Sequence, residues 1–149
     1  MPVVAARTGT ESSTERPRAY ILVSMATQVL LVEDSRAMRD YVSSILEADG
    51  DYEIHEVSNG FDALRELPRL RLDLIITDIN MPDVSGIELT NFIRQSKRHE
   101  RTPVVVISTD ASEIDRARAM GAGASVFVAK PFTPEVLLKA VNDVLGRKN

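Results

Sequence analysis

Residues Leu74–Pro82, with the sequence LIITDINMP, decide how the rest of the chain is interpreted. The run Leu74–Thr77 is apolar or β-branched throughout, it leads directly into Asp78, and turn-forming residues follow. A short, continuous apolar run of this kind is typical of a strand that is buried on both faces, as in parallel sheets. Ligands of such sheets bind just beyond the carboxyl ends of the strands. Asp78 is therefore either a turn or helix cap, or a reactive group at the mouth of a crevice.

Strands and helices are predicted to alternate on both sides of this segment. Four more strands are predicted, at residues 29–32, 52–57, 104–107 and 124–128. Helices are predicted after the N-cap Ser35, after Asn59-Gly60, around 87–93, at Ala111–Met120, and after the N-cap Thr133. Five successive strand–helix units predict an α/β fold, a doubly wound five-stranded parallel sheet with helices on both faces, in which 52–57 is an edge strand.

Helical periodicity also predicts which side chains face the core. The inward positions are expected to include the methionines and leucines of the helices, Met120 among them, together with Val136 and Leu137 of the last helix. His55 and His99 have no partners at the spacing of metal ligands, so both are expected to be ordinary surface residues.

The composition limits the classes of protein to which the chain can belong. Its 149 residues, 44% hydrophobic and 27% charged, predict one globular domain with a substantial core. A net charge of −4 gives no electrostatic reason to expect nucleic acid or an anionic membrane as a partner. The absence of cysteine excludes disulfides and thiolate chemistry and suits a cytoplasmic protein. No apolar run approaches the length of a membrane span.

Residues 1–26 differ in composition from the remainder, which we expect to form a folded domain over 27–149. They are rich in Thr, Ser, Glu, Arg and Pro and lack periodicity, which predicts a disordered N-terminal extension. A signal peptide is disfavoured, because the apolar segment Tyr20–Val23 is too short and acidic residues precede it. We favour Met25 as the physiological start of the protein.

Polar side chains follow four of the five predicted strands. In chain order they are Glu33 and Asp34, then Asp78, then Ser108, and finally Lys130. The carboxyl ends of parallel strands lie along one edge of the sheet, so these side chains are expected to converge. Two carboxylates about 4 Å apart repel each other by roughly 4 kcal/mol at an effective dielectric near 20, so a cluster of three needs a hard cation. Oxygen ligands favour Mg²⁺ or Mn²⁺, and Lys130 suits an incoming phosphoryl oxygen.

Taken singly, each of these residues also has a purely structural interpretation. Asp34 is suited to cap a helix, Glu33 and Lys130 to lie at the surface, and Ser108-Thr109-Asp110 to begin the next helix. The functional interpretation depends on their joint placement at the edge where ligands bind.

Four motifs in the same order resemble those of the response-regulator receiver domain, the CheY-like fold of two-component systems. They are LLVEDS at 30–35, LIITDINMPDVSG at 74–86, VVVIST at 104–109 and VAKPF at 128–132. The resemblance covers about residues 27 to 147. It implies that Asp78 accepts a phosphoryl group from a sensor histidine kinase or a histidine phosphotransfer protein.

The resemblance also implies roles for the neighbouring residues. Glu33 and Asp34, with Asp78 and the backbone carbonyl of Asn80, would hold Mg²⁺. Ser108 would be the switch hydroxyl, and Lys130 would pair with the phosphoryl group and precede a cis peptide bond to Pro131.

Two positions depart from the chemotaxis version of the family. The switch hydroxyl belongs to serine rather than threonine, and Phe127 stands where a tyrosine is common, so any switching there must act through packing. No second domain follows in the sequence, so we expect a single-domain response regulator whose output passes through a partner protein. The expected binding face comprises residues 111–120, 124–128 and 133–146.

Two alternatives remain beside this interpretation. A phosphorelay intermediate or phosphate sink would share every site residue. A small phosphatase with Asp78 as nucleophile is disfavoured, because such hydrolases usually carry an acid two residues further on, where this chain has Asn80. We therefore expect a phosphoacceptor that assists its own phosphorylation and dephosphorylation, rather than an enzyme.

Overall fold

Five parallel strands form one sheet in the order β2-β1-β3-β4-β5. A computed structural model of the protein describes residues 25–148, so the predicted disorder of the N-terminal extension concerns residues that lie almost entirely outside the described ones. The strands are β1 (Thr27–Val32), β2 (Tyr52–Val57), β3 (Leu74–Asp78), β4 (Val104–Ser108) and β5 (Val126–Ala129). This order is that of flavodoxin-like and CheY-like folds, with β2 at one edge as predicted.

Five helices connect and follow these strands within the described residues. They are α2 (Arg36–Asp49), α3 (Gly60–Glu66), α4 (Gly86–Gln95), α5 (Glu113–Gly121) and α6 (Pro134–Leu145). Each begins after a side chain that accepts a hydrogen bond from the backbone N–H three residues on, namely Ser35, Asn59, Ser85, Ser112 and Thr133. These caps satisfy N–H groups that lack partners within the helix.

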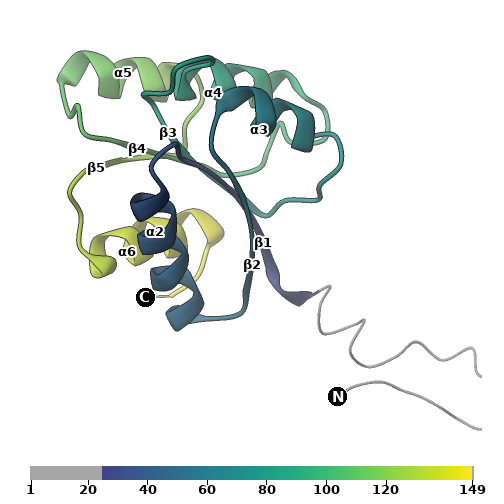
Figure 1. Ribbon diagram of the computed structural model, residues 1–149, viewed down its shortest axis with the longest axis vertical. Coiled ribbons are helices and arrows are strands. Elements are labelled where there is room, and N and C mark those ends of the chain that lie inside the picture. The colour runs from purple at the N-terminus through teal and green to yellow at the C-terminus, as the bar shows by residue number, and fades with distance from the viewer. Residues whose placement is uncertain (1–24, 149) are drawn as a thin grey trace, which may run out of the picture.

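The helices cover both faces of the sheet (Figure 1). One core cluster joins α2 and α6 to the sheet and contains Val29, Ile76 and Leu137, all fully buried. A second cluster joins α3, α4 and α5 to the opposite face and contains Leu30 and Ile75. Successive strand residues therefore point to opposite faces, and both faces are apolar, as a doubly wound sheet requires. The predicted fold class is confirmed.

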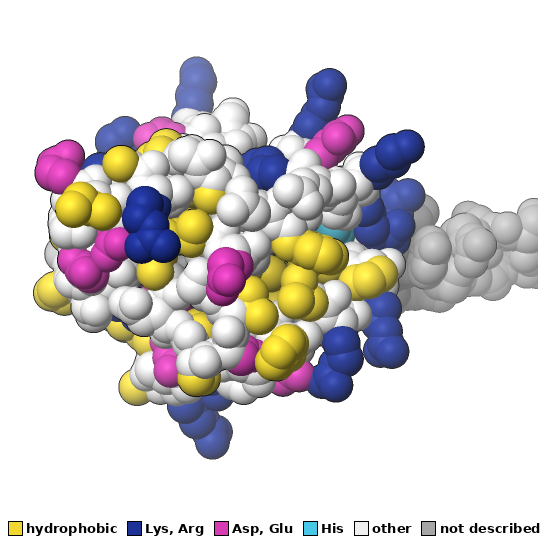
Figure 2. Space-filling model, turned by 90° about the horizontal axis from the view of Figure 1, so that it is seen from above, with side chains coloured by type: hydrophobic (Ala, Val, Ile, Leu, Met, Phe, Trp, Pro, Cys, Tyr) yellow, Lys and Arg dark blue, Asp and Glu magenta, His cyan; other side chains and the backbone are white. Residues whose placement is uncertain are grey.

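Two predicted core positions are wrong, because Met120 (44% exposed) and Val136 (50%) lie at the surface. Phe92 and Ile114, whose spacing indicated helices, are exposed as well. In α5 the buried side chain is Ala119, because small residues let this helix pack close to the sheet beside Phe127. Figure 2 views the face that α3, α4 and α5 cover, where hydrophobic side chains remain visible among charged ones.

The prediction that His99 lies at the surface is also wrong, since the residue is 2% exposed. Its Nε2 lies 2.9 Å from the carbonyl oxygen of Leu67, and its Nδ1 lies 3.3 Å from Oγ1 of Thr102. Both ring nitrogens thus have polar partners, which offset the free-energy cost of burying the imidazole. His99 joins the end of α3 to the loop between α4 and β4.

Two element boundaries also differ from the prediction. The fifth strand is β5 at Val126–Ala129 rather than 124–128, and α5 begins at Glu113 rather than at Ala111. Ser112 caps α5, so the residues after Ser108 form a loop rather than the start of the helix. Within residues 25–148, every helix is too short or too polar to cross a membrane.

Candidate functional site

The site is built around Asp78, the last residue of the central strand β3. Its side chain is 7% exposed, and Oδ2 lies 3.5 Å from Nζ of Lys130. The other carboxylate oxygen, Oδ1, is buried without a hydrogen-bond partner among the described residues. A buried, unpaired carboxylate oxygen is costly in free energy, so its presence points to a function in binding or chemistry.

The surroundings of Asp78 act on its pKa in opposite directions. Burial is the largest influence and raises the pKa, whereas the ammonium of Lys130 and the backbone N–H of Asn80 lower it. The nearby carboxylate of Asp34 raises it again, and the net pKa is above its ordinary value. A positive charge near this carboxylate would favour the ionised form.

Glu33 follows β1 and is 1% exposed. Its Oε1 accepts a 2.9 Å hydrogen bond from Nζ of Lys130, and its Oε2 accepts one of 2.9 Å from the backbone N–H of Ser35. Burial nevertheless raises the pKa of Glu33 above its ordinary value, against the lowering effects of these two donors. The purely structural interpretation of Glu33, as an acid at the surface, is therefore excluded.

Three carboxylates come together at this edge of the sheet. Oxygen atoms of Glu33, Asp34 and Asp78 all lie within 4.8 Å of one another. Asp34 is exposed, whereas the other two are buried, so the cluster is open to solvent on one side. Because one ammonium faces three carboxylates, negative charge is in excess, and the donor set consists of oxygen. The residues present fit a hard divalent cation such as Mg²⁺.

The loop after β3 brings Asn80 next to the cluster. Asn80 is exposed, two residues beyond Asp78. The amide of Gly86 donates a 2.9 Å hydrogen bond to the carbonyl oxygen of Ile79, which closes the loop onto the start of α4. A Cβ at Gly86 would lie 2.1 Å from the carbonyl oxygen of Asp78, so the close approach of these two segments requires glycine.

Ser108 ends β4, one residue beyond Ile107, which pairs with Asp78 of β3 in the sheet. Its side chain is fully buried, and Oγ accepts a 3.0 Å hydrogen bond from the backbone N–H of Asp110. Lys130 immediately follows β5, and its peptide bond to Pro131 is cis, as the sequence resemblance implies. The structure thus brings every predicted site residue except Phe127 to this edge.

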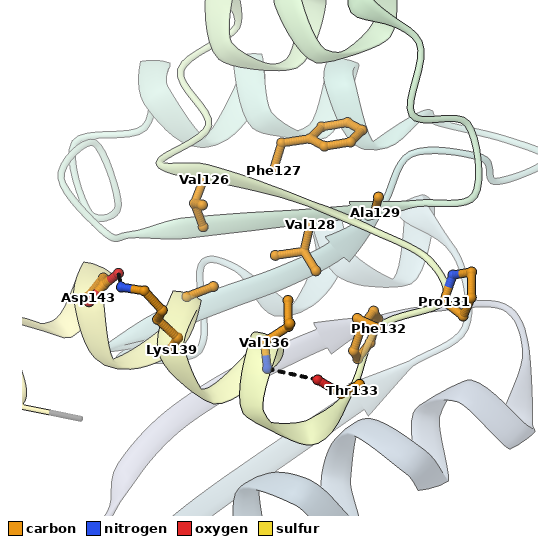
Figure 3. A pocket seen from close by; sticks show the side chains of 11 residues that line it. Val126, Phe127, Val128, Ala129, Pro131, Phe132, Thr133, Val136, Lys139 and Asp143 are labelled. Atoms are coloured by element: carbon orange, nitrogen blue, oxygen red, sulfur yellow. Dashed lines mark hydrogen bonds and ion pairs between the residues drawn. The ribbon is translucent and has the colours of Figure 1, made fainter.

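Phe127 lies within β5 and points toward α5, away from the face that Val126 and Val128 present to α6 (Figure 3). It is 6% exposed, and the guanidinium carbon of Arg116 lies 4.6 Å from the centre of its ring. The aromatic ring is thus already packed inward in this structure.

Sequence reasoning missed Arg39, whose guanidinium contacts the loop that carries two of the acids. Its signal was present in the helical periodicity, since Arg39 lies three and four residues before the buried Val42 and Ser43. A cation on the buried side of a helix requires polar partners there.

Comparisons with known proteins agree with this geometry. The family model for the response regulator receiver domain matches residues 29–142. A chemotaxis protein CheY homolog of Campylobacter jejuni is 33% identical over 120 residues, which are 80% of this chain and 92% of that protein.

Solved structures give the same result. The chemotaxis response regulator CheY4 of Vibrio cholerae is similar with a TM-score of 0.75 and 34% identity, covering 80% of this chain and 99% of that one. The receiver domain of the sensor histidine kinase PA1611 of Pseudomonas aeruginosa, solved with a magnesium ion in its active-site cleft, is similar with a TM-score of 0.75 and 29% identity, covering 81% and 98%. The chain therefore belongs to the response regulator receiver domain family of two-component signalling.

Proposed function

We propose that the protein is a single-domain response regulator that accepts a phosphoryl group on Asp78 from a histidine kinase or a histidine phosphotransfer protein. The observation that carries this proposal is the buried Oδ1 of Asp78, which lacks a partner among the described residues while Lys130 contacts Oδ2. An oxygen of Asp78 would attack the phosphorus of the phosphohistidine, the P–N bond would break, and the imidazole would leave with a proton.

The chemistry of the site supports dependence on Mg²⁺. Glu33, Asp34 and Asp78, together with the backbone carbonyl of Asn80, would hold the ion, and waters would complete its shell. When bound, Mg²⁺ neutralises charge on the transferring phosphoryl group. Lys130 lies next to both buried carboxylates and is positioned to pair with a phosphoryl oxygen.

Ser108 is proposed as the switch hydroxyl. A charge-assisted hydrogen bond from its Oγ to a phosphoryl oxygen contributes roughly 1.5–3 kcal/mol, enough to shift a two-state population about ten- to a hundredfold. Rotation of the Ser108 hydroxyl toward the phosphoryl group would remove the present acceptor of the Asp110 N–H. The loop between Ser108 and α5 would then have to rearrange. Because Phe127 is already packed inward, its part in switching is proposed to be a repacking against α5 rather than an inward turn.

The output face is proposed to comprise residues 111–120, 124–128 and 133–146, which include most of α5 and β5 and all of α6. Three exposed apolar side chains belong to it, namely Ile114, Met120 and Val136. A groove of about 430 Å³ runs between β5 and α6, with Val128 and Val136 in its wall (Figure 3). Apolar surface beside α5, of which only Ala119 is buried, suits binding of a partner protein in the cytoplasm that depends on phosphorylation.

Phosphotransfer tests the proposal. Candidate histidine kinases, each autophosphorylated with labelled ATP, are mixed with the full chain in Mg²⁺ buffer, and the label on each protein is followed over time. At least one kinase should pass its label to the wild-type chain and none to the Asp78→Asn variant. Equal transfer to both would contradict the proposal.

A phosphorelay intermediate is the second candidate, favoured by the similarity to the receiver domain of a histidine kinase. It would pass the phosphoryl group onward to a histidine phosphotransfer protein. Back-transfer from the phosphorylated chain within seconds to minutes would identify a relay, whereas slow hydrolysis on Asp78 would favour the response regulator.

A further inference from the structure

Arg39, in the first turns of α2, holds the loop that carries two of the clustered carboxylates. Its Nη1 donates a 2.8 Å hydrogen bond to the backbone carbonyl oxygen of Glu33 and lies 3.4 Å from that of Asp34. The side chain is 18% exposed. Because these contacts go to the main chain, they fix the backbone from which both carboxylates project.

Arg39 is itself held on its other edge. Its Nε lies 3.4 Å from Oε1 of Glu56 on the edge strand β2. The other carboxylate oxygen of Glu56 accepts a 2.8 Å hydrogen bond from Oγ of Ser43, one turn further along α2. The planar guanidinium offers five N–H donors in a fixed fork, so it can serve a carboxylate and two carbonyls at once. A continuous polar network therefore runs from Ser43 through Glu56 and Arg39 to the acidic loop.

We propose that Arg39 is a positioning residue for the divalent cation at the carboxylate cluster, an inference that rests on the proposed function. It acts through the backbone of Glu33 and Asp34, and it holds their side chains near Asp78 before the cation arrives. Residues that orient metal ligands without touching the metal typically contribute roughly 10- to 100-fold to metal affinity.

Because Arg39 is positively charged, an electrostatic role and a positioning role predict opposite changes in Mg²⁺ affinity when it is removed. A guanidinium near a cation site repels the cation, so a purely electrostatic role predicts that removing Arg39 tightens Mg²⁺ binding. A positioning role predicts that removal weakens Mg²⁺ binding, because the loop loses the donors that fix it. The ion pair with Glu56 reduces the electrostatic effect, so the positioning effect should decide the outcome.

The experiment is an NMR-monitored Mg²⁺ titration of the full chain, with melting temperatures measured in parallel. Arg39→Met should bind Mg²⁺ about tenfold more weakly than the wild type. Arg36→Met is the matched control, since Arg36 is on the same helix with an 85% exposed side chain. It should bind Mg²⁺ as the wild type does or slightly more tightly. Arg39→Lys should recover part of the affinity.

Ser43→Ala tests the same network without a change of charge. It should weaken Mg²⁺ binding in the same direction but by less, because Glu56 loses the hydrogen bond that orients it. Ser44→Ala is its control, since the Ser44 hydroxyl is exposed and donates to the carbonyl oxygen of Asp40. Should Arg39→Met fail to fold, the Ser43 and Ser44 pair decides the question.

The variant Asp34→Ala distinguishes failure of the proposed metal site from failure of the proposed role of Arg39. If Asp34→Ala binds Mg²⁺ as the wild type does, the proposed metal site itself is wrong. If Asp34→Ala loses affinity while Arg39→Met melts at a lower temperature but binds Mg²⁺ equally or more tightly, Arg39 is merely structural and the inference is overturned.

Discussion

The ammonium of Lys130 donates a 2.9 Å hydrogen bond to Oε1 of Glu33, although the two residues are 97 positions apart in the chain. The same Nζ lies 3.5 Å from Oδ2 of Asp78. The positive charge of Lys130 thus partly neutralises two buried carboxylates. A divalent cation at the proposed site would neutralise the same two carboxylates, so the cation and the lysine would repel each other.

Lys130→Met should therefore bind Mg²⁺ more tightly. Two unit charges of like sign about 4 Å apart repel by about 1 to 4 kcal/mol, depending on the effective dielectric, so an increase in affinity of about fivefold or more is expected. The direction is opposite to that expected for Arg39→Met. Isothermal titration calorimetry with MgCl₂ measures the effect, and weaker binding by Lys130→Met would show that the lysine positions the acids rather than competing for them.

Asp78→Asn should raise the thermal stability of the metal-free protein at neutral pH. Burial raises the pKa of Asp78 above its ordinary value of 3.8, so the folded state holds the proton more tightly than the unfolded chain does. Ionisation of Asp78 therefore costs stability as the pH rises from about 3.8 through the higher folded pKa. Each kcal/mol of stability gained corresponds to an increase in Tm of about 2–8 °C.

Calorimetric melting of both proteins without metal from neutral to acidic pH measures this difference. The advantage of Asp78→Asn should shrink as the pH falls below the folded pKa, because the wild-type carboxyl then becomes neutral as well. A constant difference in Tm at every pH would assign the effect to packing instead of charge.

Two glycines should respond oppositely to alanine. At Gly86 a Cβ would lie 2.1 Å from the carbonyl oxygen of Asp78, so Gly86→Ala forces the two segments apart and should cost about 1–3 kcal/mol. At Gly121, in the last turn of α5, no heavy atom lies within 4 Å of the added carbon. Gly121→Ala should be neutral or stabilise by up to about 1 kcal/mol. Urea denaturation measures both, and equal effects would contradict the described packing of the loop after β3.

Ser108→Ala should separate metal binding from switching. The hydroxyl is bonded to the N–H of Asp110, and we expect Mg²⁺ affinity to stay near that of the wild type. On phosphorylation, amide shift changes in the wild type should concentrate between Ser108 and Phe132. In Ser108→Ala those in α5 should shrink while those around Asp78 persist. Changes found mainly in α2 would mean that the output face is misplaced.

Much of the fold follows from local sequence. The central strands β3 and β4 are continuous apolar runs and the edge strand β2 alternates. Ser35, Asn59 and Thr133 mark helix starts through bonds that span three residues. The side chains facing the core were harder to predict where apolar residues are sparse. In α5 alanine provides the packing surface, and the larger apolar side chains of Ile114 and Met120 are exposed.

The residues that directly line the site could be predicted because topology brings strand ends to one edge. The partners of these residues could not. Buried His99 has the carbonyl oxygen of Leu67 as a partner, and Arg39 contacts the carbonyl oxygens of Glu33 and Asp34. Periodicity places Arg39 on the buried side of its helix, but a bond to a main-chain oxygen does not depend on the residue type of the acceptor. A sequence therefore does not show which oxygen a distant side chain will reach.

Phosphorylation of Asp78 itself can be measured by mass. The full chain is incubated with acetyl phosphate in Mg²⁺ and its intact mass is recorded, beside Asp78→Asn and a sample with excess EDTA. We expect the addition of one phosphoryl group to the wild type, none to Asp78→Asn, and little without Mg²⁺. Labelling of Asp78→Asn to the same extent as the wild type would contradict the assignment of Asp78 as the phosphoacceptor.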